Sequence, residues 1–191
     1  VDSLQAYNTG NAIFLRIGNR THSDKVGSMD SVLNSNLYVE IPEGKPDAGY
    51  EYEGPIEHMP RNISPASIIG LKGHPITHVT LKNVVINHPG AGKSEIAKVG
   101  ITPEEIDNDP EMADSSPEFS FFKDLPAWGL YLRHVEGIAL ENITFIARKR
   151  DYRPAIVLDD AHHVNMSKMK IQEPGKKKQQ IHVYQSTNIT K

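Results

Sequence analysis

The sequence contains no cysteine among its 191 residues. Without thiols, the chain has no disulfide framework, no thiolate metal site and no cysteine nucleophile. It also lacks any run of the roughly 18 apolar residues that a membrane-spanning helix needs, so we expect no membrane span. An excess of one charge is missing as well, since 21 Lys and Arg residues are balanced by 24 Asp and Glu residues. This balance does not indicate a nucleic-acid partner.

What the sequence does contain is a degenerate repeat. The segments "HVTLKNVVI" (78–86), "GIALENITF" (137–145) and "HVNMSKMKI" (163–171) share the order apolar-x-apolar-x-x-apolar-x-apolar, and "SVLNSNLYV" (31–39) is a weaker copy. Alternating apolar residues predict a strand with one buried face. The two-residue gap in the middle of each copy breaks this alternation, so we expect a bend there.

The residues at the predicted bend support this interpretation. Asn is the non-glycine residue that best tolerates a left-handed backbone, which a sharp bend between strands often requires. The residues just before the second half of each copy are Asn36, Asn83, Asn142 and Lys168. We therefore expect left-handed backbone at these four positions.

The repeat unit extends upstream of most copies. Short apolar runs ending in Leu precede them, namely "SIIGL" (67–71), "GLYL" (129–132) and "AIVL" (155–158). Each unit is therefore predicted to contain about three short strands separated by bends, which is typical of a β-solenoid. The Asn-Gly and Asp-Gly pairs that would indicate hairpins of a sandwich are absent.

The repeat therefore predicts an all-β fold, a short parallel β-helix, as a single domain over residues 1–191. Two stretches interrupt the repeat, at about 40–66 and 87–127, and we expect them to be loop insertions. Within the second insertion, "TPEEIDNDPEM" (102–112) carries a capping box and a proline at the first helical position, which predict a short helix.

Five segments carry a family resemblance: "GNAIFLRIGNRT" (10–21), "PEGKPDAGYEYEGP" (42–55), "PASIIGLKGHP" (65–75), "PEFSFFKDLPAWGLYLRHVEGIALENIT" (117–144) and "DYRPAIVLDD" (151–160). Together they resemble the C-terminal half of bacterial members of glycoside hydrolase family 28, the polygalacturonase family. The resemblance implies a right-handed single-stranded parallel β-helix and an inverting hydrolase of pectic polysaccharides. It also implies no cofactor, no metal, and a periplasmic or extracellular location for the parent protein.

The family's catalytic motifs follow a fixed order: Asn-Thr-Asp, Asp-Asp, Gly-His-Gly and Arg-Ile-Lys. The segment "RIG" at 16–18 resembles the fourth motif, with Gly18 where the family has Lys. Because the other three motifs would precede it, we expect the catalytic aspartates upstream of residue 1 and no catalytic residue in this chain. Three other short matches fail on residue or on order: "YNTG" (7–10), "KGHP" (72–75) and "LDD" (158–160).

Arg16 is the strongest candidate for substrate binding. In a family whose substrates carry uronate carboxylates, a guanidinium beside the catalytic strand makes charge-assisted, bidentate contacts. Asn19, Arg20 and His22 follow on the same loop and are candidates for lining the cleft. Because Gly18 removes one cation, the substrate is open between polygalacturonate and a different uronate or rhamnose-containing pectic linkage.

Aromatic and acidic residues supply the remaining candidates. Tyr131, like Trp128, is a candidate for stacking on a sugar ring, with a position in the core as the alternative for one of the two. The repeat alignment sets Asp159 and Asp160 on Arg133 and His134 of the previous copy. This predicts an exposed turn with an Asp–Arg contact between repeats worth about 0–1 kcal/mol.

Two functions stay open at this point. One is the C-terminal part of a family 28 pectin hydrolase, which supplies turns of the β-helix and one wall of the substrate cleft without catalysis of its own. The other is a non-catalytic carbohydrate-binding or structural β-solenoid module. An active hydrolase that uses Asp159 and Asp160 is the least favoured reading. The expected partner is a uronate-containing pectic oligo- or polysaccharide.

A solenoid without its front turns has a physical difficulty. Its end exposes an apolar cross-section and unpaired strand edges, which a cap normally covers. We therefore expect the chain either to self-associate through its N-terminal end or to be capped there by its own residues 1–10.

Overall fold

The computed structural model describes residues 1–22, 24–43, 64–92, 111, 113–114, 119, 125–175 and 180–191. These residues contain ten strands and no α-helix: β1 (Asp2–Tyr7), β2 (Phe14–Arg16), β3 (Asp30–Glu40), β4 (Ala66–Ile69), β5 (Ile76–His88), β6 (Leu130–Ala147), β7 (Ile156–Ser167), β8 (Lys170–Gln172), β9 (Ile181–Tyr184) and β10 (Thr187–Thr190). The all-β class predicted from the repeat is confirmed. Most of the two predicted insertions, and all but Glu111 of the predicted helix at 102–112, lie outside the described residues.

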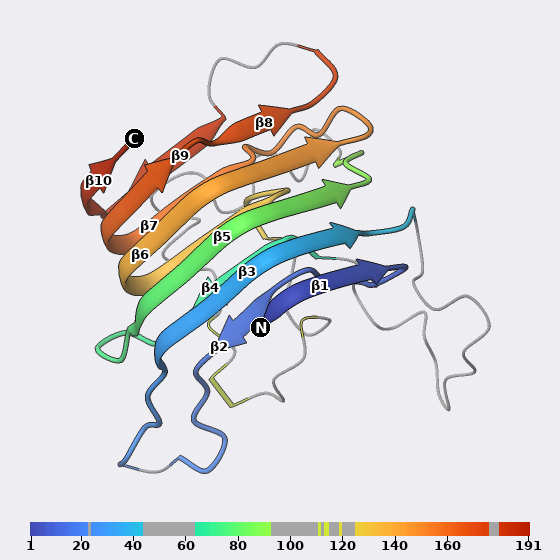
Figure 1. The fold of residues 1–191 in the computed structure, drawn as a ribbon. Helices are drawn as coiled ribbons and strands as arrows, with labels where there is room; N and C mark the ends of the chain where they lie inside the picture. Colours follow the sequence, from blue (N-terminus) through green and yellow to red (C-terminus); the bar gives the residue numbers. More distant parts are fainter. Residues whose placement is uncertain are drawn as a thin grey trace, which may run out of the picture.

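All ten strands belong to one curled sheet, and every pairing between them is parallel (Figure 1). The pairings form three ladders. Ladder A runs β2–β4–β6–β7–β9, ladder B runs β3–β5–β6–β7–β10, and ladder C runs β1–β3–β5–β6–β8. The sheet curls because β3, β5, β6 and β7 each take part in more than one ladder. In the described part of the chain, no helix is long and apolar enough to cross a membrane.

The strand register agrees with the repeat alignment. Residues that the alignment places in one column face each other on neighbouring strands: Leu81 with Leu140 and Met166, Ile86 with Phe145 and Ile171, and Leu132 with Leu158. In the middle of the stack these side chains are almost fully buried and belong to the main core. The alignment of the repeat copies is therefore confirmed at the level of single residue pairs, although one unit forms a single strand, β6, and not three short ones.

The predicted bends are also confirmed. The φ angles are 55° at Asn36, 54° at Asn83, 55° at Asn142 and 53° at Lys168, all left-handed. The asparagines stack, since Asn142 Nδ2 donates to Asn83 Oδ1 at 2.9 Å and Asn83 Nδ2 donates to Asn36 Oδ1 at 2.8 Å. Asn36 Nδ2 in turn donates to Asp2 Oδ1 at 2.8 Å. Asn therefore has two roles at these bends. It tolerates the left-handed backbone, and its side-chain amide forms hydrogen bonds between neighbouring repeats.

The outer face of ladder A is covered, unlike a solvent-facing sheet surface. Leu130 and Leu132 point into the main core, so the alternating Tyr131 points to the opposite face. There a second, smaller apolar cluster forms from Ile69, Leu125, Ala127, Tyr131 and Val157, with Phe14 packed against it. Leu125 and Ala127, at the end of the second predicted insertion, therefore pack on ladder A.

Candidate functional site

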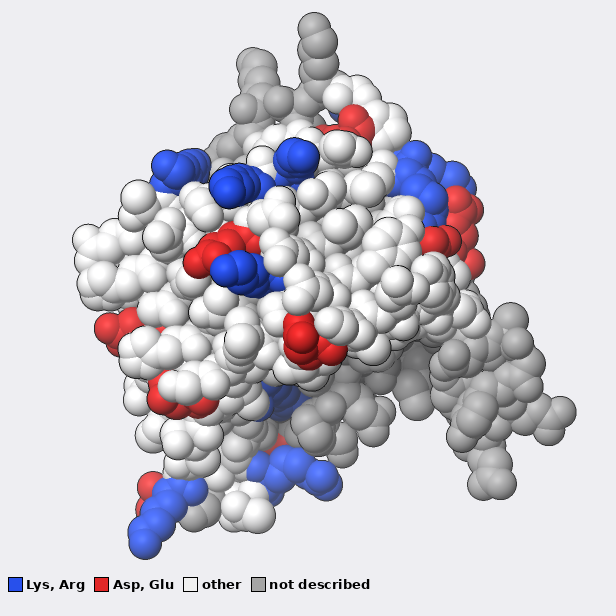
Figure 2. All heavy atoms as spheres, viewed as in Figure 1, with Lys and Arg blue, Asp and Glu red and all other residues white. Residues whose placement is uncertain are grey.

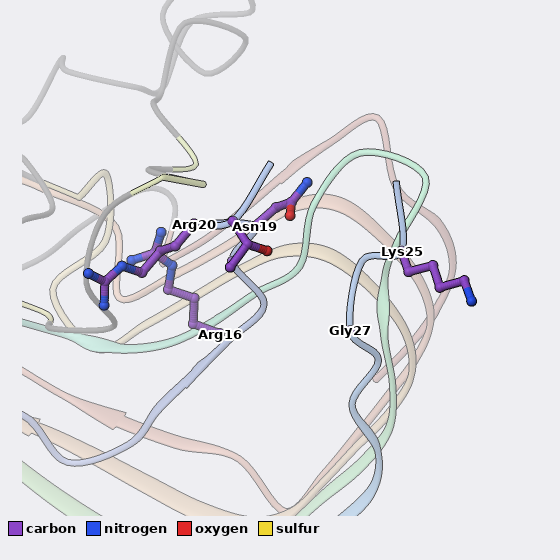
Figure 3. A pocket seen from close by; sticks show the side chains of 7 residues that line it. Arg16, Asn19, Arg20, Lys25 and Gly27 are labelled. Carbon is purple, nitrogen blue, oxygen red and sulfur yellow. The ribbon is translucent and has the colours of Figure 1, made fainter. Parts of the chain in front are cut away.

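A pocket of about 310 Å³ lies where β2 ends and the chain leaves the sheet toward β3. Its lining consists of Arg16, Gly18, Asn19, Arg20, Thr21, Lys25 and Gly27 (Figure 3). Three of the five binding residues predicted from the sequence are thus brought together here. The volume lies at the lower end of the range for ligand pockets, which favours a small group such as a single sugar unit.

Arg16 occupies the last position of β2, in register with Ile69 on β4 and, one strand further, with Arg133 on β6. Only 9% of the residue is exposed, and this burial lowers the pKa of its guanidinium. The ordinary pKa lies so far above neutrality that the side chain keeps its charge. Arg16 is therefore a cation held in place by the sheet, and not a side chain that moves freely in solvent.

Arg16 and Arg20 bring their guanidinium groups to the same side of the pocket, as Figure 3 shows. Lys25 stands on the opposite side, and its ammonium group points away from the two arginines. Two neighbouring guanidinium groups create a local positive potential and present several planar N–H donors, which match the two oxygens of a carboxylate. The pocket is thus suited to an acidic ligand.

Gly18 lies where another part of the chain approaches the backbone closely. A Cβ atom on Gly18 would lie 3.1 Å from the carbonyl oxygen of Ala113. The same carbonyl accepts a hydrogen bond of 2.7 Å from the backbone N–H of Asn19. Gly18 therefore permits a close backbone approach that a larger residue would crowd, a contact between distant segments that the sequence did not reveal.

His22 lies beside the pocket but does not line it. Its Nδ1 atom is 3.6 Å from Asp114 Oδ1, and both side chains are largely exposed. An exposed pair of this kind contributes about 0–1 kcal/mol. The structure therefore keeps His22 near the site without giving it a position in the cavity wall.

Tyr131 lies away from the pocket, in the second apolar cluster. Only 1% of the residue is exposed, and its hydroxyl donates a 2.9 Å hydrogen bond to Asp159 Oδ2. A ring so enclosed has no face open for stacking on a sugar. Trp128 is equally buried and meets the Phe145 ring edge-on. Both aromatics are core residues: Tyr131 packs with Leu125 and Ala127 on the outer face of ladder A, and Trp128 lies in the main core.

The predicted exposed turn at Asp159 is wrong, because Asp159 is only 1% exposed. The predicted contact between repeats is confirmed, since Asp159 is in register with Arg133 and forms an ion pair with it. Burial raises the pKa of the Asp159 carboxyl, although Arg133 and Tyr131 act in the opposite direction. Because its carboxylate binds Arg133 and Tyr131, Asp159 has a structural role in ladder A.

His134 extends this ionic group toward the second insertion. Its Nε2 atom is 2.6 Å from Glu111 Oε1, and its Nδ1 atom is 2.5 Å from Asp160 Oδ2. Burial acts to lower the pKa of His134, but the two carboxylates outweigh it and raise the pKa above its ordinary value. Two acceptors on one ring favour the doubly protonated imidazolium. Sequence alignment placed Asp160 beside His134, but Glu111 was not foreseen as their partner.

Within the described ranges, no group of three or more His, Asp and Glu residues has an arrangement that could hold a metal ion.

Comparisons of this chain with protein-family models, with curated proteins and with solved structures found no match. The residues of the pocket and the chemistry that they permit are therefore the basis for inferring a function.

Proposed function

We propose that this chain is the C-terminal portion of a polygalacturonase-like glycoside hydrolase, folded as a right-handed single-stranded parallel β-helix. In this proposal the chain supplies turns of the β-helix and one wall of the cleft that binds a uronate-containing pectic saccharide. The observation that carries the proposal is the placement of Arg16, Asn19 and Arg20 in one pocket. The three parallel ladders and the resemblance of "RIG" at 16–18 to the family's fourth motif support it.

The proposed chemistry is binding and orientation. A uronate unit carries a carboxylate, which Arg16 and Arg20 hold from one side by charge-assisted hydrogen bonds. The Asn19 amide offers both a donor and an acceptor for sugar hydroxyls. Catalytic aspartates are assigned to a preceding part of the parent protein, which acts in the periplasm or outside the cell. Because Gly18 replaces a cation, a uronate in a linkage other than polygalacturonate, including a rhamnose-containing one, fits the proposal best.

Isothermal titration with acidic oligosaccharides tests the proposal. Oligogalacturonides and rhamnogalacturonan fragments are titrated into the chain and into its Arg20→Ala variant, which alters the pocket while leaving the buried Arg16 in the sheet. We expect Arg20→Ala to weaken binding about tenfold or more, because a charge-assisted hydrogen bond contributes about 1.5–3 kcal/mol. Lys170→Ala on β8 removes one exposed cation far from the pocket and serves as the matched control.

The ligand itself provides a second control. The methyl esters of the same oligosaccharides lack the negative charge, so we expect them to bind more weakly than the acids and with little dependence on salt. Equal affinity for acid and ester, or equal weakening by Arg20→Ala and Lys170→Ala, would contradict the proposal. Absence of binding to any saccharide would favour the structural module instead. A reducing-sugar assay on the chain alone is expected to show no turnover.

A further inference from the structure

Two described residues of the second insertion contact the sheet at different places. The Oε1 atom of Glu111 lies 2.6 Å from His134 Nε2 and 3.6 Å from Arg133 Nη2, both on β6. Ala113, two residues further along the chain, accepts the 2.7 Å hydrogen bond from the backbone N–H of Asn19, which lines the pocket. One short stretch of chain therefore joins an ionic group on β6 to the loop that forms the candidate binding pocket.

These two contacts lie close enough together to be coupled. Arg16, at the start of the pocket, is two strands away from Arg133 in ladder A, which is about 10 Å at the usual spacing of paired strands. Two residues of fully extended chain span at most about 7 Å, so a large movement of Glu111 displaces Ala113 as well. The Ala113 carbonyl would then no longer meet the backbone N–H of Asn19.

His134 lies between two carboxylates that are held in place differently. Its Nδ1 atom is 2.5 Å from Asp160 Oδ2, and its Nε2 atom is 2.6 Å from Glu111 Oε1. Asp160 is on β7, which is in register with β6, so the sheet itself maintains this contact. Glu111 comes from outside the sheet, where it also meets Arg133 and the backbone N–H of Lys72. Of the two carboxylates, Glu111 is therefore the one that can move.

The protonation state of the ring decides whether both contacts persist. An imidazolium donates from both nitrogens, whereas a neutral imidazole has one N–H and turns a lone pair toward the other carboxylate. Because the sheet maintains the contact with Asp160, deprotonation weakens the contact with Glu111. The other charged groups nearby are Arg133, which is paired with Asp159, and His162, whose Nε2 atom lies 3.0 Å from the second oxygen of Asp160. Since Arg133 still attracts Glu111, we expect this contact to loosen.

This ionic group differs from the charges elsewhere on the sheet. Figure 2 shows that the Lys, Arg, Asp and Glu side chains over β3, β5 and β6 lie apart, with uncharged surface between them. At His134, by contrast, two carboxylates meet one ring whose side chain is only 8% exposed. Solvent and salt screen such a buried interaction less than an exposed one, so a change in the charge of the ring has a larger effect here.

The pKa of His134 brings this change into an experimentally convenient range. Burial lowers the pKa and the two carboxylates raise it, with a net increase above the ordinary value of 6.5. The contact with Glu111 is therefore complete below that value and weakens as the pH rises through the raised pKa. Carboxylate ligands and guanidinium groups keep their charges over the same range, so they do not themselves make binding depend on pH there.

From these contacts we propose that His134 and Glu111 are positioning residues of the pocket. The protonated ring holds Glu111, and through Ala113 this contact keeps the backbone of Asn19 in place for an acidic ligand. The affinity of the pocket for such a ligand then falls as the medium becomes alkaline. The coupling rests on contacts within the chain, whereas its effect on a saccharide rests on the proposed function.

The backbone amide of Asn19 reports the coupling without any ligand. Nuclear magnetic resonance follows its chemical shift, and that of the His134 ring, between pH 5.5 and pH 9. In the wild-type chain we expect both to change with the same midpoint. In Glu111→Ala the ring should still titrate against Asp160, but the Asn19 amide should no longer follow it.

Asp160→Asn is the matched control, because it removes the other carboxylate from the ring and leaves Glu111 in place. The Asn19 amide should follow the ring in this variant too, with a lower midpoint. His22 is a second ionisable ring on the pocket loop, and its backbone N–H donates to the Asn19 carbonyl. His22→Gln should therefore leave the titration of the Asn19 amide unchanged. An Asn19 amide that does not follow His134, or that follows it equally in Glu111→Ala, would overturn the proposal.

Isothermal titration with an oligogalacturonide at pH 5.5 and pH 9 measures the consequence for binding. The wild-type chain should bind about two- to tenfold more weakly at pH 9, which is the effect of one hydrogen bond. Glu111→Ala should bind with the weaker affinity at both pH values. Equal wild-type affinity at both pH values would overturn the proposal and leave the proposed function intact. No binding at either pH, with an Asn19 amide that follows His134, would support the coupling and contradict the proposed function.

Discussion

The outer face of ladder A and the outer faces of ladders B and C are made by the same repeat, yet they differ in what covers them. On ladder A, Tyr131, Arg133 and Asp159 are buried, and Leu125 and Ala127 of the second insertion pack against Tyr131. On ladders B and C, charged residues such as Lys82 and Glu141 remain about half exposed. The repeat alone builds the sheet, whereas the residues that pack against ladder A decide that this face holds a buried ionic group.

The largest expected effect comes from the ion pair on ladder A. Asp159→Ala leaves the Arg133 guanidinium buried with its main carboxylate partner removed, which typically costs about 3–5 kcal/mol. Urea unfolding followed by circular dichroism measures the loss. A variant as stable as the wild type would show that Asp159 is exposed to solvent. The outer face of ladder A would then not differ in burial from the outer faces of ladders B and C.

His134 gives a second, pH-dependent way to test the covered face. Its folded-state pKa is raised above the ordinary value of 6.5, so the stability it contributes is complete below that value and is lost as the pH rises through the folded-state pKa. His134→Gln should therefore cost about 1.5–3 kcal/mol at pH 5.5 and clearly less at pH 9. A cost that is equal at both pH values would show that His134 contributes only by packing.

The row of left-handed bends formed by Asn36, Asn83, Asn142 and Lys168 should show an intermediate effect on stability. Asn83→Ala removes two amide hydrogen bonds and places Ala at a φ of 54°, so we expect a loss of about 1–2 kcal/mol in unfolding free energy. Asn83→Gly removes the same hydrogen bonds but tolerates the backbone angle. Glycine should therefore be less destabilising than alanine, and the reverse order would contradict the role of the left-handed bend.

The smallest effect is expected on the exposed face. Glu141→Ala removes the pair with Lys82, whose atoms lie 3.3 Å apart with both side chains about half exposed. The change in unfolding free energy should stay within about 0.5 kcal/mol and shrink further at high salt. A cost near that of Asp159→Ala would remove the distinction between the two faces.

The same comparison separates what the sequence predicts from what it does not. The bends at Asn36, Asn83 and Asn142 and the pairing of Arg133 with Asp159 follow from the repeat, because neighbouring repeats lie in register. The burial of Asp159 and Tyr131 does not follow from it. Burial there depends on Leu125 and Ala127, whose contacts with ladder A are not periodic.

The pocket, too, was predicted only in part. Arg16, Asn19 and Arg20 were found because they are close in sequence and follow one strand. The contacts that complete the site, from Ala113 to Asn19 and from Glu111 to His134, join segments far apart in the chain. Neither residue type nor spacing predicts such contacts, because a single Glu or Ala in an insertion forms no recognisable pattern.

The most direct test of the account is to locate the bound saccharide by nuclear magnetic resonance. Amide chemical shifts of the chain are followed during titration with an acidic pectic oligosaccharide. The account predicts saturable shifts concentrated in residues 16–27, with little change in β8 and β10. Shifts that centre on another face of the sheet, or no shifts with any acidic oligosaccharide, would contradict a uronate-binding pocket at Arg16.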